Sequence, residues 1–271
     1  MATSVLDRAL ARNSWIVGGC LALIAALAWL WLWRQWVAMN GGVEAALSMP
    51  DMDMGGAMMV SPADVWAYLV SAFAMWLLMM TAMMLPSAAP MILLYSRLAG
   101  GARTQGAALL PTALFAGVYL AVWAAFSIVA ALAQWLLIRT GAVSDVTLAF
   151  GDQRVGGALL IAAGLYQATP LKRACLDSCR SPMSFLMRSW RPSWAGAARL
   201  GLMHGLYCLG CCAVLMALLF VFGVMNLVWV AALSLFVLIE KALPFGQRIG
   251  QIAGVAAIIL GGIMVLGIDL A

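Results

Sequence analysis

The sequence predicts an all-helical integral membrane protein, and three observations lead to this fold class. Hydrophobic residues make up 66% of the 271 residues and charged residues only 9%, a composition outside the range of soluble domains. The apolar residues form runs of about 20, the length that a helix needs to cross a bilayer core. The basic residues are concentrated between particular runs, as in membrane proteins with a fixed orientation. We therefore expect one transmembrane domain over residues 1–271.

Seven apolar runs are candidate membrane-spanning helices. They cover residues 14–36, 64–86, 109–138, 154–171, 197–222, 225–243 and 248–268. The first run is too long for the hydrophobic part of a signal peptide, and no small-residue cleavage site follows it before Arg34, so we expect a retained helix. The tight turn Gly223–Asn226 makes a helical hairpin of the fifth and sixth runs.

The distribution of charge tests this count of helices. With the N-terminus inside, 12 of the 15 basic residues fall in inner segments, and only Arg34, Arg139 and Arg154 fall outside. Because one missed helix would invert every later loop, this asymmetry favours seven spans with the C-terminus outside. The net charge of +5 does not indicate nucleic-acid binding, since the basic residues are confined to particular loops.

The longest inner segment, residues 172–196, contains a predicted interfacial helix. Pro182 can begin a helix. The apolar side of that helix would carry Met183, Leu186, Met187 and Trp190. Such a helix would lie against membrane lipid at the inner surface. The alternative is an ordinary basic loop that follows the positive-inside rule.

The predicted outer loop, residues 37–63, is rich in methionine. Five methionines and two aspartates fall within Met49–Met59, in a Gly-rich and polar setting that does not resemble a packed helix. Thioethers favour Cu(I), so Met52 and Met54 are candidate copper ligands. A flexible loop that touches lipid headgroups is the alternative.

The second apolar run carries two methionine stripes. Met75, Met79 and Met83 recur every four residues. Met80, Met84 and Met91 form a second stripe beside them. Methionine also fills irregular helix contacts, so a packed core and a pathway for Cu(I) are both consistent with this pattern. The stripes end at Pro86 and Pro90, where we expect a break in the helix that frees backbone carbonyl groups.

A pair of cysteines follows in the inner segment. Cys175 and Cys179 are spaced to share one face of a helix, and Lys172, Arg173 and Arg180 are their neighbours in sequence. Positive charge lowers the pKa of a thiol and favours the thiolate. We expect either a pair of metal ligands or a redox pair.

The strongest metal signal lies in the fifth run, which holds the single histidine of the chain and three of its six cysteines. At 3.6 residues per turn, these side chains fall within about a third of the helix circumference. They are His204, Cys208, Cys211 and Cys212. Thiolate and imidazole ligands suit Cu(I) or zinc. Since a lone cysteine is often only a packing residue, the prediction rests on the four together.

Small and charged residues complete the candidate site. Gly201 and Gly205 would let a neighbouring helix approach closely and supply further ligands. Glu240 and Lys241 lie at the inner end of the sixth run, where a charged side chain is costly unless it has a partner or a function. They are either an interfacial pair or a gate or proton site that faces the cysteines.

Four motifs resemble one known family. They are Gly164–Cys175 with Cys179–Pro182, His204–Cys212, Met83–Ser87 with Pro90 and Met91, and Met225–Asn226 with Glu240–Lys241. Together they resemble a bacterial family of unknown function labelled "predicted metal-binding integral membrane protein", over roughly residues 64–268. The resemblance implies a bacterial inner (plasma) membrane protein that binds metal, and it assigns no catalytic residue.

Three functions are consistent with these features. The first is Cu(I) handling as a transporter or a delivery factor, with a cytoplasmic or periplasmic metal chaperone as partner. The second is a thiol–disulfide oxidoreductase that uses Cys208 with Cys211 and Cys175 with Cys179. The third is a non-catalytic assembly subunit of a larger membrane complex. The residues favour a protein that is not an enzyme.

Overall fold

The computed structural model of the chain describes residues 2–47, 65–101, 109–144 and 148–267. Every regular element in these ranges is a helix, from α1 to α10. The β pairing within them is limited to an isolated bridge between Val143 and Phe150. The all-helical fold class predicted from the sequence is confirmed.

Five segments are long and apolar enough to cross a membrane. They consist of α1 (Ala2–Leu47), α2 (Val65–Gly101), α3 (Leu109–Arg139), α7 (Trp194–Ala217) with its continuation α8 (Leu219–Phe222), and α10 (Gly246–Leu266). These correspond to the first, second, third, fifth and seventh apolar runs of the sequence. Their composition supports membrane insertion, as expected.

The fourth and sixth predicted spans are shorter than expected. They correspond to α4 (Gln153–Gln167), of 15 residues, and α9 (Leu227–Ala242), of 16 residues. At 1.5 Å per residue each is about 22–24 Å long, less than the hydrocarbon thickness of about 30 Å. The count of seven spans therefore stays a prediction.

Helix α1 extends well beyond the predicted first span and reaches Leu47, which takes in the first part of the predicted outer loop. The rest of that loop, with Met52 and Met54, lies outside the described residues.

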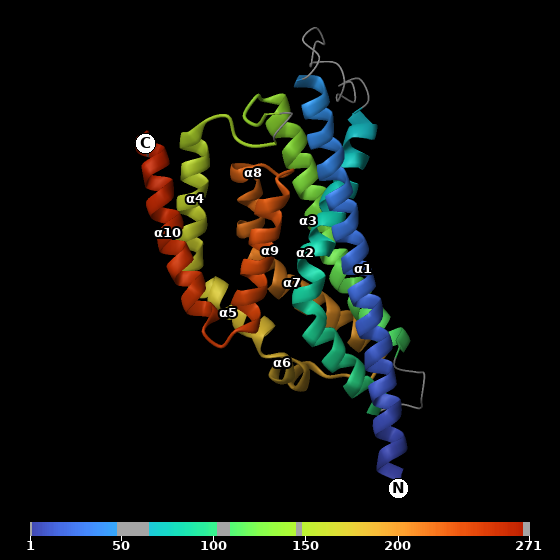
Figure 1. Ribbon diagram of the computed structural model, residues 1–271. Coiled ribbons are helices and arrows are strands. Elements are labelled where there is room, and N and C mark those ends of the chain that lie inside the picture. Colours follow the sequence, from blue (N-terminus) through green and yellow to red (C-terminus); the bar gives the residue numbers. More distant parts are fainter. Residues whose placement is uncertain (1, 48–64, 102–108, 145–147, 268–271) are drawn as a thin grey trace.

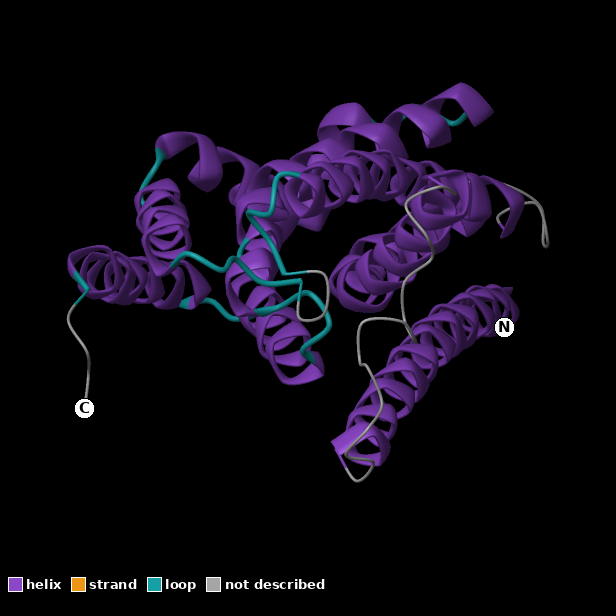
Figure 2. Cartoon of the chain, turned by 90° about the horizontal axis from the view of Figure 1, so that it is seen from above, coloured by secondary structure: helices purple, strands orange, loops and turns teal. Residues whose placement is uncertain are grey.

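The helices lie side by side in one bundle. Helix α2 packs between α1 and α3, α3 packs on α7, and α4 packs along α10. Seen from above, α1 lies at one edge of the bundle and α10 at the other (Figure 2). Figure 1 shows the N-terminus, α5 (Pro170–Arg180) and α6 (Pro182–Ser189) at one end, and the C-terminus at the opposite end.

A helix, α6, forms in the segment predicted to be interfacial, and it begins at Pro182. Its position at the membrane surface stays a prediction. Leu186 is fully buried against the bundle, whereas Met183 and Met187 are exposed. The apolar residues predicted for one side are thus divided between the bundle and the surface.

Helix α2 continues through both of its prolines, so the expected break at Pro86 is absent. Proline has no N–H, which leaves the carbonyl group four residues earlier without its helical partner. That carbonyl belongs to Ala82, and the indole Nε1 of Trp29 on α1 donates to it over 3.0 Å. A freed carbonyl thus serves as a contact between two helices.

Glycines allow two pairs of helices to approach closely. A Cβ at Gly201 would lie 2.4 Å from the carbonyl oxygen of Phe115, and one at Gly205 would lie 2.8 Å from the side chain of Val122. The close approach predicted for this glycine pair is confirmed, and α3 is the neighbour. Gly164 on α4 faces α10 in the same way, 2.4 Å from a backbone carbonyl oxygen.

The seven-span prediction can be tested with reporter proteins fused after Ser189. Seven spans place α5 and α6 inside the cell, whereas five spans place their four basic residues outside, against the positive-inside rule. Alkaline phosphatase joined after Ser189 should be inactive, and a green fluorescent protein at the same joint should fluoresce. Phosphatase activity at this joint would exclude the seven-span topology.

Neighbouring glycines on α10 provide a test of helix packing. A Cβ at Gly261 would lie 2.5 Å from the carbonyl oxygen of Gly157, whereas a Cβ at Gly262 meets nothing within 4 Å. Gly261→Ala should lower the free energy of unfolding by about 1–3 kcal/mol, the usual cost of overpacking. Gly262→Ala should leave it unchanged or raise it slightly. Thermal unfolding in detergent measures both, and equal effects would contradict this account.

Candidate metal site

Four thiols from two helices meet inside the bundle, and we name them the thiol cluster: Cys179 on α5, and Cys208, Cys211 and Cys212 on α7. The Sγ atoms of Cys211 and Cys212 lie 3.3 Å apart. The Cys211 thiol also donates to the carbonyl oxygen of Cys208 over 3.2 Å. Cys179 lies close enough to Cys208 and Cys211 to interact with both thiols. The three α7 thiols are buried, and Cys179 is partly buried.

The local sequence of α5 places Cys179 there. Thr169 caps the first turn by accepting from the backbone N–H of Lys172, and Pro170 begins the helix. Cys175 and Cys179 then face α7 together, as their spacing predicts. A Cβ at Gly210 would lie only 2.7 Å from the Sγ of Cys175, so this glycine lets α5 approach α7.

The expected effect of positive charge on the α5 thiols is wrong. Burial raises the pKa of Cys175, and interaction with the Cys208 side chain raises the pKa of Cys179. The basic neighbours in sequence are directed elsewhere. Lys172 forms an ion pair with a carboxylate on α9, and Arg180 donates to two backbone carbonyl groups just after α9.

Cys208 is the point at which the surrounding helices meet. The Nζ of Lys241 on α9 lies 3.0 Å from its Sγ and donates to Ser87 on α2 over 3.1 Å. The hydroxyl of Tyr119 on α3 lies 3.2 Å from the same Sγ. Helix α3 therefore supplies a tyrosine at the position where the sequence suggested a further metal ligand.

Glu240 and Lys241 point in different directions, because consecutive residues on a helix are about 100° apart. Only Lys241 reaches the thiol cluster. The carboxylate of Glu240 pairs with the Nζ of Lys172, at 2.8 Å from Oε1 and 2.9 Å from Oε2. Lys172 also donates to Gln167, and both charged side chains are almost completely buried. This pair joins α9 to the beginning of α5.

His204 lies one turn before Cys208 in an aromatic environment. Its ring centroid is 6.1 Å from that of Phe115, 5.4 Å from that of Tyr119 and 5.9 Å from that of Phe185. The imidazole is 3% exposed, and its Nδ1 has no hydrogen-bond partner. A buried polar atom without a partner costs about 1–3 kcal/mol, so a ligand bound at this nitrogen would recover that free energy.

The arrangement of His204 and Cys208 around one ion stays a prediction. Within the described residues, no group of three or more histidine, cysteine, aspartate or glutamate side chains is arranged to hold a metal. The thiols instead contact one another, and Cys208 also contacts Lys241 and Tyr119. The Sγ atoms of Cys211 and Cys212 lie 3.3 Å apart, which is shorter than the edge of about 3.8 Å that four sulfurs at 2.3 Å from one metal would define.

Both methionine stripes of α2 lie in the core. Met75 is 7% exposed, and the exposures of Met79, Met80, Met83 and Met84 do not exceed 1%. The carbonyl oxygen of Met84 accepts from the hydroxyl of Tyr119 over 3.2 Å. Since that hydroxyl also touches Cys208, the second stripe lies close to the thiol cluster at Met84.

Sequence reasoning missed two parts of this site. Tyr119 is a hydroxyl in the middle of an apolar run, a signal that it needs a polar partner when buried. The ion pair of Lys172 with Glu240 joins residues 68 positions apart, and only the demand of buried charge for a partner pointed toward it.

Loss of one member of this ion pair should destabilise the bundle. Lys172→Met should lower the free energy of unfolding by about 3–5 kcal/mol, because Glu240 is left buried without its cation. Arg173→Met, at the exposed neighbouring position, should have little effect. The double variant Lys172→Met/Glu240→Leu should recover most of the loss. Denaturant unfolding in detergent measures all three, and a single variant as stable as the Arg173→Met control would refute the importance of the pair.

Comparison with known proteins gives one family match. The family model described as "PpoB2: Copper chaperone" matches residues 73–264, which include α3 to α9, most of α2 and nearly all of α10. No curated protein and no solved structure matches the chain. The sequence motifs led us to expect a metal-related family, and the matched family is metal-related. Because the model covers more than half of the chain, the protein belongs to the PpoB2 copper chaperone family.

Proposed function

We propose that the protein binds Cu(I) at the thiol cluster and delivers it to a partner in or beside the membrane. The observation that carries this proposal is the meeting of Cys179 with Cys208, Cys211 and Cys212 in the bundle core. Soft thiolate ligands select Cu(I) over the harder divalent metals. Membership of a copper chaperone family supports copper over zinc.

The hydrogen-bonded thiols suit a metal that is held and then released. Cu(I) is stable with as few as two sulfur ligands, so it needs no closed cage of four. Two thiols of the cluster can turn toward one ion while the others remain hydrogen-bonded. A site of this kind exchanges its metal with other thiols more readily than a fully enclosed one, which suits delivery.

Lys241 provides the charge that such a site needs. Two thiolates with one Cu(I) ion carry a net charge of −1, which is costly in a low-dielectric interior without a counter-ion. The ammonium group of Lys241 lies 3.0 Å from the Sγ of Cys208, where it offsets this charge. We assign it this electrostatic role rather than that of a ligand.

The methionine stripes of α2 are the proposed connection to the outer side. Met80 and Met84 are buried in the core, and Met84 is linked through Tyr119 to Cys208. Thioethers bind Cu(I) more weakly than thiolates, so an ion moving inward along α2 would pass to stronger ligands. In this proposal copper captured outside by Met52 and Met54 reaches the cluster by this route.

The proximity of Cys211 and Cys212, with Sγ atoms 3.3 Å apart, also makes a thiol–disulfide oxidoreductase the second candidate. The two functions differ in the state of the thiols. Copper bound in proportion to protein with all thiols reduced supports copper delivery. A metal-free protein that forms a mixed disulfide with a substrate supports the oxidoreductase.

Copper binding tests the proposed function. The protein, purified in detergent under reducing and anaerobic conditions, should hold about one Cu(I) per chain that resists a competing chelator. Cys208→Ser and Cys179→Ser should each lose it. Lys241→Met should weaken the affinity by about 10–100-fold, the usual effect of a group that supports metal ligands without binding the metal.

The matched control is Cys20→Ser, since Cys20 is exposed on α1 and should not affect copper. If Cys208→Ser and Cys179→Ser retain copper with unchanged affinity, the thiol cluster is not the binding site.

A further inference from the structure

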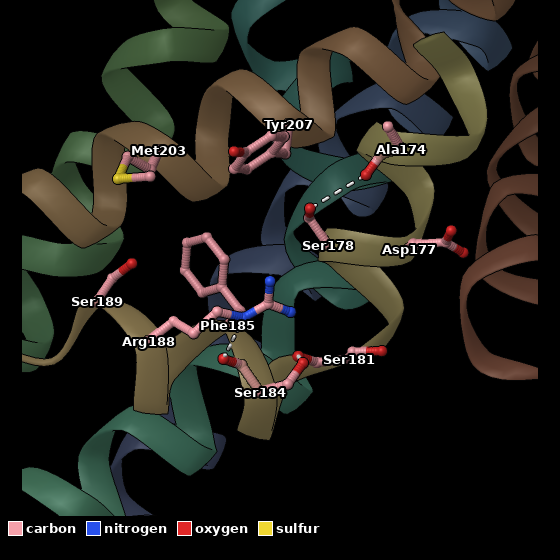
Figure 3. A pocket seen from close by; sticks show the side chains of 10 residues that line it. All are labelled: Ala174, Asp177, Ser178, Ser181, Ser184, Phe185, Arg188, Ser189, Met203 and Tyr207. Atoms are coloured by element: carbon pink, nitrogen blue, oxygen red, sulfur yellow. Dashed lines mark hydrogen bonds between the residues drawn. The ribbon is translucent and has the colours of Figure 1, made fainter. Parts of the chain in front are cut away.

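A pocket of about 360 Å³ opens between α5, α6 and α7, at the end of the bundle that holds the N-terminus. Its volume falls in the range of small-molecule sites. Figure 3 shows that charged, hydroxyl, thioether and aromatic side chains line it. None of the roles assigned above uses this pocket.

The pocket and the thiol cluster lie on adjacent faces of α5, about 100° apart. Ala174 and Ser178 line the pocket, whereas Cys175 and Cys179 face α7. On α7, Met203 and Tyr207 line the pocket. His204 directly follows Met203 and lies on the buried side of the helix, so the two sites are adjacent on α7. A rotation of about 100° around α7 thus leads from the pocket wall to the interior.

One aromatic side chain separates the pocket from His204. Phe185 lines the pocket and is 7% exposed. Its ring centroid lies 5.9 Å from that of His204 and 6.0 Å from that of Tyr207. The His204 ring that it contacts carries a buried Nδ1 with no hydrogen-bond partner. A change of the Phe185 rotamer would connect the pocket with this nitrogen.

The pocket offers both signs of charge. Asp177 and Arg188 line it, and the Arg188 side chain extends across it (Figure 3). Arg188 donates from Nε to the carbonyl oxygen of Ser184 over a long 3.4 Å. The ion pair found within the described residues joins Lys172 to Glu240. Because the Arg188 guanidinium and the Asp177 carboxylate take no part in it, both are open to a ligand.

We propose that this pocket docks a small thiol with a zwitterionic amino-acid end, which carries Cu(I) to or from the thiol cluster through His204. Arg188 binds the carboxylate of the carrier and Asp177 its ammonium group. The carrier sulfur, with its copper, then faces Met203 and Phe185. The inference rests on the proposed function and names the partner of that site.

The exchange needs no oxidant or reductant, because copper stays Cu(I) throughout. Copper arrives between the sulfur of the docked carrier and the sulfur of a second carrier molecule. These two bonds break, and two bonds from copper to cluster sulfur form. The protons of the two cluster thiols pass to the two departing carrier thiolates. His204 binds copper through Nδ1 between these steps and releases it at the end. It speeds the transfer and is not part of the final site.

Two copper donors with different charges test the pocket. The probes are Cu(I) bound to the tripeptide glutathione, which has a zwitterionic end, and Cu(I) in acetonitrile, which has none. Stopped-flow transfer to the full-length, metal-free protein gives a rate for each donor. Arg188→Gln and Asp177→Asn should slow transfer from glutathione by about tenfold, the effect of one charged hydrogen bond. Both should leave transfer from acetonitrile unchanged.

Arg191→Gln is the matched control, since Arg191 is exposed and does not line the pocket. It should change neither rate. His204→Phe keeps an aromatic ring against its neighbours and should slow transfer from both donors while the copper bound at equilibrium stays the same.

Three outcomes would overturn the inference. Equal slowing of both donors by Arg188→Gln would show that the pocket does not recognise the carrier. Retention of phosphatidylethanolamine by the wild type but not by Arg188→Gln, measured by mass spectrometry, would make the pocket a lipid site. Failure of the wild type to take copper from either donor would instead refute the proposed function, on which the inference depends.

Discussion

Charged side chains inside an apolar bundle must find their partners within it, and α9 meets this constraint in two directions. Glu240 pairs with Lys172 and so fixes the beginning of α5. Lys241 reaches the Sγ of Cys208 on α7. Since α5 is held against α9 and α7 at once, Cys179 comes to lie among the α7 thiols. The convergence of four cysteines therefore depends on two charges that bind no metal.

Much of the architecture follows from the sequence alone. Apolar runs of membrane length predicted the five long segments, since composition and length suffice to decide them. Helix periodicity predicted that Cys175 and Cys179 share a face, and a glycine pair predicted the approach of a neighbour to α7. These features depend on residues within one turn or one run. The short α4 and α9 show the limit, because tertiary contacts determine where a helix ends.

The site itself was only half predictable. The α7 cysteines share one stripe by their spacing, but their contact with Cys179 depends on how α5 packs. The positive charge near Cys175 in sequence suggested a lowered pKa, whereas Lys172 turns away toward Glu240 and burial dominates. His204 shares the stripe of Cys208, yet its ring packs among aromatic side chains from α3 and α6. A charged residue that is close in sequence does not fix the electrostatic environment of a thiol, because a long side chain can reach several different partners.

Gly210 illustrates how structural and chemical roles can be confused. The residue has no side chain to bind anything, yet the Sγ of Cys175 lies against it, and its carbonyl oxygen accepts from Tyr166 on α4. Any side chain there would push α5 from α7 and carry Cys179 away from its partners. If the thiol cluster binds copper as proposed, a genetic screen for cells that lose copper-dependent growth would recover changes at Gly210 together with changes at the cysteines. Only the three-dimensional arrangement separates the residue that sets the spacing from the residues that provide the sulfur.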